Sequence, residues 1–482
     1  MRIPRRVVLA PMAVMLCLGL WGLERGTMWR DESATYQMTQ RTLRQILRAM
    51  GGVDAVHGLY YLLMHPVLAA SPSEVALRLP SLLASMAATG LVAALGCRLA
   101  RPRAGLWAGL LYAATPMVGH YAQEGRSYAL VAAGAAWATW LLVGAVERCS
   151  AASWVAYGTV VTVTALLHVF AVLLLAAHAL TLLASRAPRR AWRGWGLAAT
   201  GAVAAVAPLA RLARRQSAQI AWIPEPGPGR LWALAHHFAG PSGLILAINA
   251  LLIAVALARP RRTRPRRPSL TAVALPLALT PPLLLFALSQ YRPLFQERYL
   301  LFALAGVPLL AAAGADRLVT AVTDHRHTAV ATAGAIAVGG AFLWQLPLHA
   351  WERAPASRQD DLAALAQAVG RLTRPGEPVL YDPPKERRIA IAYPRPLAGL
   401  RDVALAVPGP ASGTLYGIDV GPSELLRRLG TARGAWVVAA DEPKSRRAKT
   451  AVLTGHFRLA YSLCLPGVRL ERYVRRNTVG AR

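Results

Sequence analysis

The chain has 482 residues, of which 55% are hydrophobic and 16% are charged, and its formal net charge is +31. Soluble domains carry roughly 25% charged residues, so this composition excludes an ordinary soluble protein and is typical of an integral membrane protein. The arginines gather in short loops between apolar runs, as in segments that face the cytoplasm and anionic lipid, which excludes nucleic acid as a partner.

The N-terminal region predicts a membrane anchor. Residues 1–6 are basic and residues 7–23 are apolar, as in a signal peptide, but no small-residue cleavage site follows. We therefore expect an uncleaved first span with a cytoplasmic N-terminus. A long polar loop then covers residues 24–77.

Ten further apolar runs follow, several of them near the ~20 residues that a bilayer requires and some a little short. They lie at 79–99, 104–118, 128–146, 154–168, 169–185, 196–212, 244–258, 270–288, 299–315 and 328–346. Together with the first run they predict about 11 transmembrane helices. If the spans alternate, the arginine-rich loops near 98–103, 186–193 and 259–267 share the side of the N-terminus, and the positive-inside rule makes that side cytoplasmic.

The C-terminal region has a different pattern and predicts a small α/β domain, which gives the division 1–349 and 350–482. Helices are expected at 361–372 and 422–429, strands at 378–381 and 435–440, a hairpin at 459–474 and a loop at 375–396. Asp360 and Asp361 are expected to cap the first helix. An odd number of spans makes this domain extracytoplasmic.

Polar side chains concentrate at the outer ends of the apolar runs, where they need partners or a water-filled cavity. Carboxylates there can deprotonate an acceptor hydroxyl, and arginines can hold a phosphate in a bidentate fork. Glu124 and Tyr128 are four residues apart, which predicts one helix face. The candidates are Asp31, Glu32, His57, Tyr60, Arg78, Tyr121, Gln123, Glu124, Arg126, Tyr128, His168, Arg298 and Tyr299.

Each candidate also has a structural alternative. The acid pair at 31–32 is also compatible with a solvated loop, Glu124 and Arg126 with a salt-bridged helix cap, and His168 with a packed core histidine. Arg298 is compatible with a helix-end anchor that snorkels to the interface. The four cysteines have no metal-ligand spacing.

Five ordered motifs resemble glycosyltransferase family 39. They are Trp29-Arg30-Asp31-Glu32, Asp54-x-x-His57-Gly-Leu-Tyr-Tyr, Arg78-Leu-Pro-Ser, Gln123-Glu-Gly-Arg-Ser-Tyr-Ala-Leu and Glu297-Arg-Tyr-Leu. The resemblance covers about residues 30–346. The family has the GT-C membrane fold and includes protein O-mannosyltransferases and the lipid A aminoarabinose transferase.

The resemblance implies a role for each candidate. Asp31 is the expected base, Glu32 orients the acceptor, and Glu124 positions acceptor or base. The donor phosphate is assigned to Arg126 and Arg298, with Arg78, Tyr128 and Tyr299 beside them. The expected pocket-lining residues are His57, Tyr60, His168, Tyr121 and Gln123.

The implied function is transfer of a sugar, mannose-like, from a polyprenyl-phosphate donor to a hydroxyl on the outer face of the plasma membrane, with inversion. The acceptor is left open among protein, glycan and lipid, and a divalent metal ion is left open as a cofactor. The competing interpretation is a non-catalytic transporter or flippase of polyprenyl-linked sugars, for which internal repeats are expected. The sequence shows no such repeat.

Overall fold

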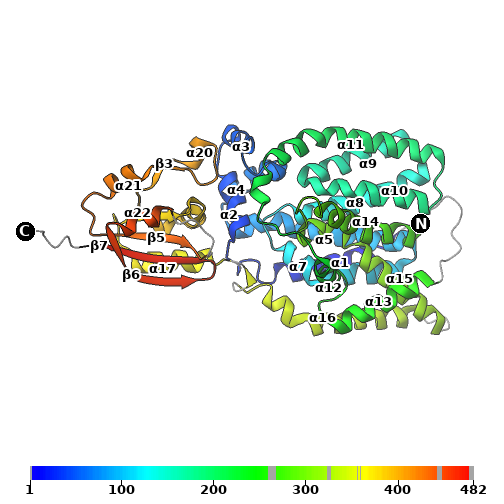
Figure 1. Cartoon of the computed structure of the whole chain (residues 1–482). Helices are drawn as coiled ribbons and strands as arrows, with labels where there is room; N and C mark the ends of the chain where they lie inside the picture. The colour runs from blue at the N-terminus through cyan, green and yellow to red at the C-terminus, as the bar shows by residue number, and fades with distance from the viewer. Residues whose placement is uncertain are drawn as a thin grey trace, which may run out of the picture. The chain divides into compact units, whose positions relative to one another are not determined.

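The computed structural model describes residues 3–25, 27–258, 268–322, 327–354, 357–358, 360–441 and 448–476 (Figure 1). The arginines of the predicted 259–267 loop lie outside this range. The chain forms two compact units. The first unit comprises Met1–Leu23, Ala55–Tyr60 and Arg78–Glu352, and the second comprises Glu24–Asp54, Tyr61–Leu77 and Arg353–Arg482.

The first unit is a bundle of helices, and every predicted apolar run coincides with helical structure. Its α-helices are α1 (Arg5–Leu20), α5 (Glu74–Leu99), α6 (Pro102–Ala114), α7 (Pro116–Ala122), α8 (Tyr128–Arg148), α9 (Ala151–Leu167), α10 (Leu174–Ala184), α11 (Arg189–Arg215), α12 (Pro228–Ala239), α13 (Gly243–Ala258), α14 (Leu270–Ser289), α15 (Gly306–Val322) and α16 (His327–Trp351). Short 3-10 helices lie between them: η1 (Ala55–His57), η2 (Val169–Leu173), η3 (Ser217–Ile220) and η4 (Glu297–Ala303).

Several of these runs are broken into shorter pieces, which affects the number of spans. In the described part of the chain, α5, α8, α11 and α14 are long and apolar enough to cross a membrane. The bent pairs α12–α13 (81°) and η4–α15 (46°) raise this number to six if each pair is one span. One break has a clear cause, because Thr115 precedes Pro116 and is extended, so α6 ends and α7 begins there. The total of about 11 spans stays a prediction.

Helices of the first unit approach one another closely where a side chain is missing. A Cβ on Gly314 of α15 would lie 1.8 Å from the carbonyl oxygen of Leu252 in α13, and one on Gly105 of α6 would lie 2.4 Å from that of Ala93 in α5. Only glycine permits these two contacts between backbones. The helices that they join are therefore held in close, fixed pairs.

The second unit contains a five-stranded sheet in the order β2-β1-β5-β7-β6. Strand β1 (Pro378–Asp382) is parallel to β2 (Arg401–Asp402) and to β5 (Gly434–Ala440), whereas β7 (Val468–Arg475) is antiparallel to β5 and to β6 (Phe457–Leu465). The remaining elements are α17 (Leu362–Leu372), η6 (Pro384–Arg387), α18 (Arg388–Ala392), α19 (Pro394–Leu397), β3 (Leu405–Val407), α20 (Gly409–Ser412), β4 (Ile418–Asp419), α21 (Pro422–Leu429) and α22 (Ala448–Thr454).

The sheet of the second unit is covered on both faces, which explains why β1 and β5 read as continuous apolar runs. Leu365 of α17 packs in one core cluster with Val438. Leu425 of α21 packs in a second cluster with Val437, the neighbouring residue of β5. The helices and strands predicted near 361–372, 378–381, 422–429, 435–440 and 459–474 are all present.

Two predictions of loop were wrong. Residues 375–396 contain β1 and three short helices, and residues 24–77 contain α2 (Arg30–Thr39), α3 (Leu43–Met50) and α4 (Gly58–Ala70). The polar composition of residues 24–77 concealed helix signals such as the capping box of Thr42 and Gln45. Much of this segment packs within the second unit, so its polar side chains find partners in the C-terminal part of the chain.

Glu377, just before β1, connects three strands of the sheet. Its carboxylate accepts hydrogen bonds from the indole of Trp436 in β5 and the guanidinium of Arg472 in β7, both at 2.7 Å. Burial acts to raise the pKa of Glu377, but these bonds and one from the Arg374 N–H together lower it below its usual value. The charged carboxylate is therefore the form that stabilises the sheet.

We expect Glu377→Gln to lower the free energy of unfolding of the second unit by about 1 kcal/mol at neutral pH. The effect is this small because the site is partly exposed and solvent screens the charge. A carboxyl with a lowered folded-state pKa stabilises above its unfolded pKa of about 4.3, and that contribution is lost as the pH falls through the folded value. The difference between variant and wild type should therefore shrink in acid. This difference in stability is measured by heating the full chain and monitoring the protection of residues 360–476 from protease. Glu424→Gln, which removes an exposed ion pair on α21, is the control and should change little.

Candidate functional site

The predicted acid pair lies in the first turn of α2. Asp31 and Glu32 follow the N-cap residue Trp29, where the free N–H groups and the helix dipole favour a negative charge. Glu32 is completely buried, whereas Asp31 is partly exposed. Of the two carboxylates, Asp31 is thus the more accessible one.

The C-terminal part of the second unit holds the start of α2 in place. The Arg30 N–H donates to Asp360 at 3.2 Å, and Asp360 also lies 3.2 Å from the guanidinium of Arg388. On the other side, the Met28 N–H donates to the hydroxyl of Tyr393 at 2.9 Å, and that hydroxyl donates to Glu74. The backbone on both sides of Asp31 is therefore fixed by polar side chains of the second unit.

This arrangement corrects the prediction that both aspartates cap α17. Asp361 does so and accepts a hydrogen bond from the Ala364 N–H at 2.9 Å. Asp360 instead binds Arg30 and Arg388, and no sequence pattern indicates either contact. Only the tertiary structure reveals Asp360, Arg388 and Tyr393 as supports of the acid pair.

In the first unit, four predicted residues from distant parts of the chain form one group, which we call the histidine–tyrosine cluster. Its members are His57, Tyr128, His168 and Tyr299, from η1, α8, the break between α9 and η2, and η4. The ring of His168 lies 4.7 Å from that of Tyr299, 5.7 Å from that of Tyr128 and 5.8 Å from that of His57. The cluster thus brings together three of the five sequence motifs, those of His57, Tyr128 and Tyr299, with His168.

Two predicted arginines act on this cluster. Burial lowers the pKa of His57 well below its usual range, and the nearby guanidinium groups of Arg126 and Arg298, with His168, act in the same direction. Neutral His57 can donate or accept hydrogen bonds but adds no charge. Arg298 also lies over the rings of Tyr299 (5.6 Å) and Trp222 (6.0 Å). The positive charge beside the cluster therefore comes from the arginines.

Glu124 does not lie on the helix of Tyr128, so the predicted shared helix face is wrong. Helix α8 begins at Tyr128, and Glu124 belongs to the preceding turn. The hydroxyl of Ser81 donates to the carbonyl oxygens of Glu124 (2.6 Å) and Arg126 (3.2 Å) and so fixes the turn. The buried carboxylate of Glu124 lies 3.3 Å from Nε2 of His120, whose Nδ1 lies 2.6 Å from Glu352.

Two other candidates bind the chain near the end of α1. Arg78 donates to the carbonyl of Leu23 at 2.9 Å, and Gln123 donates to the carbonyls of Gly19 (2.8 Å) and Trp21 (2.9 Å). Their roles at the donor and in the pocket stay predictions. Tyr121 stacks edge-on against Tyr128 at 5.5 Å, and Tyr60 is completely buried.

The predicted site residues are thus divided between the units. Asp31 and Glu32 belong to the second unit, and all the others belong to the first. Over the part of the chain that the structure describes, no group of three or more His, Cys, Asp or Glu side chains could hold a metal ion.

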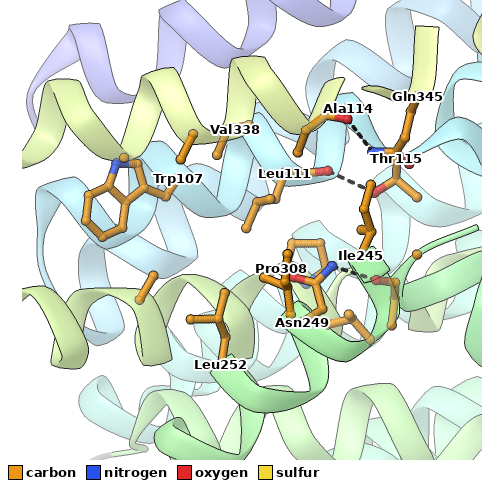
Figure 2. A pocket seen from close by; sticks show the side chains of 18 of the residues that line it. Trp107, Leu111, Ala114, Thr115, Ile245, Asn249, Leu252, Pro308, Val338 and Gln345 are labelled. Carbon is orange, nitrogen blue, oxygen red and sulfur yellow. Dashed lines mark hydrogen bonds between the residues drawn. The ribbon is translucent and has the colours of Figure 1, made fainter. Parts of the chain in front are cut away.

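The first unit also contains an apolar cavity of about 410 Å³ (Figure 2). Trp107 and Leu111 of α6, Leu252 of α13, Pro308 of α15 and Val338 of α16 are among the residues that line it. A cavity of this kind is suited to a hydrocarbon ligand.

The polar side chains that line the cavity leave it apolar, because their donor groups bond to the backbone. Thr115 donates to the Leu111 carbonyl (2.8 Å), Asn249 to the Ala239 carbonyl (2.5 Å) and Gln345 to the Ala341 carbonyl (3.0 Å). Their donor groups therefore serve the backbone.

Comparison with known proteins gives one family. Residues 59–211 match the profile of the dolichyl-phosphate-mannose-protein mannosyltransferases. None of the curated proteins matches the chain.

Solved structures of similar fold cover nearly the whole chain. ArnT from Cupriavidus metallidurans bound to undecaprenyl phosphate matches with a TM-score of 0.64 and 15% identity over 96% of this chain and 97% of that one. The apo form of the same protein matches with a TM-score of 0.63 and 13% identity over 96% of this chain and 97% of that one. The oligosaccharyltransferase of Archaeoglobus fulgidus matches with a TM-score of 0.54 and 12% identity over 97% of this chain and 73% of that one. The profile match at residues 59–211 and the fold that the chain shares with these solved structures agree with the resemblance found in the sequence.

Proposed function

We propose that this protein transfers a sugar from a polyprenyl phosphate to an acceptor hydroxyl at the outer face of the plasma membrane, with a mannose-like sugar as the first candidate. The observation that carries the proposal is the placement of Arg298 over the ring of Tyr299, with Arg126 also acting on the histidine–tyrosine cluster. Two guanidinium groups in such surroundings suit a phosphate diester. The undecaprenyl phosphate in the ArnT structure and the mannosyltransferase profile support the same donor class.

In the proposed reaction Asp31 is the base. Its carboxylate takes the proton of the acceptor hydroxyl while that oxygen forms a bond to the anomeric carbon. The bond from this carbon to the phosphate oxygen breaks on the opposite face, so the configuration inverts. Glu32 and Glu124 orient the reacting groups, and the polyprenyl phosphate leaves as an anion.

The leaving phosphate gains negative charge as the bond breaks. Arg126 and Arg298 stabilise this charge, and the interaction is stronger in the transition state than in the bound donor. A divalent cation is the alternative source of part of this stabilisation. If a cation contributes, EDTA lowers the rate of transfer and added Mg²⁺ or Mn²⁺ restores it, whereas stabilisation by the arginines alone leaves the rate unchanged.

The apolar cavity is the proposed place for part of the polyprenyl chain. Its volume of about 410 Å³ and its apolar lining suit isoprene units, which a bilayer-embedded protein can take up directly from the lipid phase. Its walls are well defined because Gly314 allows α13 and α15 to touch.

The decisive experiment for the proposal measures cleavage of the donor. Purified protein is incubated with polyprenyl-phosphate-mannose or polyprenyl-phosphate-aminoarabinose in the presence of membranes from the source cell, and the release of polyprenyl phosphate is followed. A glycosyltransferase releases it, whereas a transporter or flippase moves the donor across a vesicle membrane and leaves it intact.

We expect Asp31→Asn to reduce sugar transfer by roughly 10²–10⁴-fold, because the amide cannot accept the proton. Expression and donor binding should be retained. Asp361→Asn is a matched control in the same unit, since asparagine caps a helix as well as aspartate does, and it should transfer at the wild-type rate. Near-normal transfer by Asp31→Asn would refute the assignment of the base.

We expect Arg298→Ala to weaken donor binding by roughly 10-fold or more, because a charge-assisted contact to the phosphate is lost. The exposed residue Arg292 lies in the same segment, so Arg292→Ala is the control and should bind the donor normally. Binding is measured by titration with fluorescent polyprenyl phosphate. Equal affinity in the two variants would place the phosphate contact elsewhere.

We expect Leu252→Trp, which fills part of the cavity, to raise the KM for a long-chain polyprenyl-phosphate donor several-fold through steric exclusion. A donor with a short prenyl chain should be less affected. Leu251→Trp is the control because Leu251 is 62% exposed on the outer side of the same helix. If both variants handle long and short donors as the wild type does, the chain does not occupy this cavity.

A further inference from the structure

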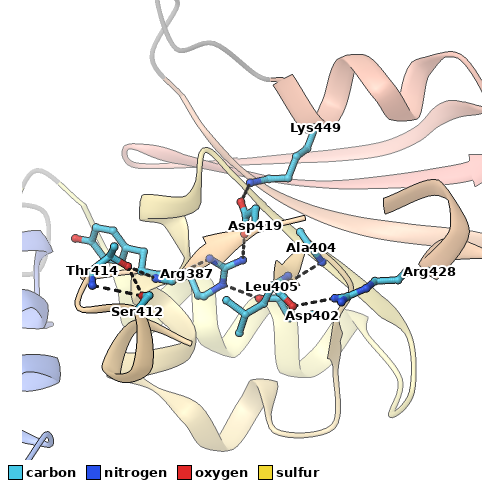
Figure 3. Close-up of polar contacts among 11 residues, drawn as sticks. Arg387, Asp402, Ala404, Leu405, Ser412, Thr414, Asp419, Arg428 and Lys449 are labelled. Atoms are coloured by element: carbon cyan, nitrogen blue, oxygen red, sulfur yellow. Dashed lines mark hydrogen bonds and ion pairs between the residues drawn. The ribbon is translucent and has the colours of Figure 1, made fainter. Parts of the chain in front are cut away.

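A loop of the second unit, residues 408–417, is held by an unusually complete set of polar contacts (Figure 3). Arg387, which is buried, donates from Nη1 to the carbonyl of Tyr416 at 2.5 Å, from Nε to Asp402 at 2.6 Å and from Nη2 to Asp419 at 2.7 Å. Lys449 forms a second ion pair with Asp419. The base of the 408–417 loop is therefore fixed.

The loop is also closed internally. Strands β3 and β4 pair in antiparallel fashion on either side of it. The hydroxyls of Ser412 and Thr414 lie 2.9 Å apart, and the Gly417 N–H donates to the Thr414 hydroxyl at 2.9 Å. With each of these contacts made, the loop has few alternative conformations.

The 408–417 loop reaches the segment that carries the predicted base. The buried guanidinium of Arg41, two residues beyond α2, donates to the carbonyls of Thr414 (2.8 Å) and Leu415 (3.2 Å). A Cβ on Gly409 would lie 3.0 Å from the same guanidinium, so the approach is close. Arg41 thus ties the loop to α2 within one unit.

At the end of this loop, Tyr416 lies among charged groups of the acid-pair region. Burial, with Asp54, Asp31 and Glu386 nearby, raises the pKa of Tyr416 to about 12, against the opposing effect of Arg388. The phenol is therefore a protonated hydrogen-bond donor at neutral pH. Among the residues that the structure describes, its hydroxyl has no hydrogen-bond partner.

From these contacts we infer that Tyr416 binds the acceptor: its hydroxyl hydrogen-bonds the incoming hydroxyl group next to Asp31, and the 408–417 loop forms one wall of the acceptor site. This inference depends on the proposed function. The loop is tethered by Arg387 and Arg41 at both sides, which presents the phenol in a fixed position. A preorganised donor of this kind lowers the cost of orienting the acceptor.

The surrounding charges also restrict the class of acceptor. Arg387 binds the carbonyl of Tyr416, and the next residue, Arg388, pairs with Asp360 beside the start of α2 and with Glu386. The carboxylates that act on the phenol are those of Asp54, Asp31 and Glu386. An acceptor with a phosphate or carboxylate beside its reacting hydroxyl would be repelled here. The site therefore selects acceptors whose reacting group is neutral.

The test compares transfer of the donor's sugar to an acceptor with hydrolysis of the same donor by water. Radiolabelled polyprenyl-phosphate-mannose and polyprenyl-phosphate-aminoarabinose are each given to the full-length protein in membranes of the source cell. Sugar transferred to endogenous acceptors is then measured against free sugar released by hydrolysis. Tyr416→Phe removes one hydroxyl and should lower the ratio of transfer to hydrolysis about 10-fold. Tyr461→Phe, on the exposed face of β6, is the control and should keep the ratio.

The outcomes separate the inference from the proposed function. A fall in the ratio of transfer to hydrolysis that occurs in Tyr416→Phe alone supports the acceptor contact. General damage to the protein lowers transfer and hydrolysis equally and leaves this ratio constant. An unchanged ratio in Tyr416→Phe, together with a collapse of both fates in Asp31→Asn, overturns the inference alone. Donor cleavage at the wild-type rate in Asp31→Asn overturns the proposed base and the inference with it.

Discussion

The central constraint of this molecule is the placement of two adjacent carboxylates, Asp31 and Glu32, at the start of α2. A bare acid in hydrocarbon is costly, so it needs firm partners or water. Here the start of α2 is bound by Asp360 and Tyr393, which belong to a folded C-terminal α/β unit. The helix start that carries the predicted base is therefore held by residues more than 300 positions further along the chain.

In the proposed reaction the two units supply different chemical groups. The first unit holds arginines, neutral aromatic and histidine side chains, and an apolar cavity, all of which suit a lipid phosphate. The second unit holds carboxylates with hydroxyl donors, which suit proton transfer from an alcohol.

Periodicity, motif order and the distribution of arginines predicted the helical membrane class and the strands and helices of the C-terminal unit. Three members of the histidine–tyrosine cluster were also within reach, because Tyr128 and Tyr299 begin apolar runs and His168 ends one on the predicted outer side. The turn at Glu124 could not be predicted from the sequence, since it depends on the hydroxyl of Ser81, 43 residues earlier. Likewise, a polar segment such as residues 24–77 looks like a loop until its partners near residues 360–416 are known.

Tyr416 shows why such a residue escapes sequence reasoning. It stands between Leu415 and Gly417 in a stretch with no catalytic pattern, and its position is set by Arg387 and by Arg41, 375 residues away from Tyr416 along the chain. Each tether binds a backbone carbonyl, so the residue types of the loop carry almost no trace of the contact. A functional side chain placed by its neighbours' backbone can therefore be recognised only from the folded structure, through the charges that it faces and the hydrogen bond that it does not make.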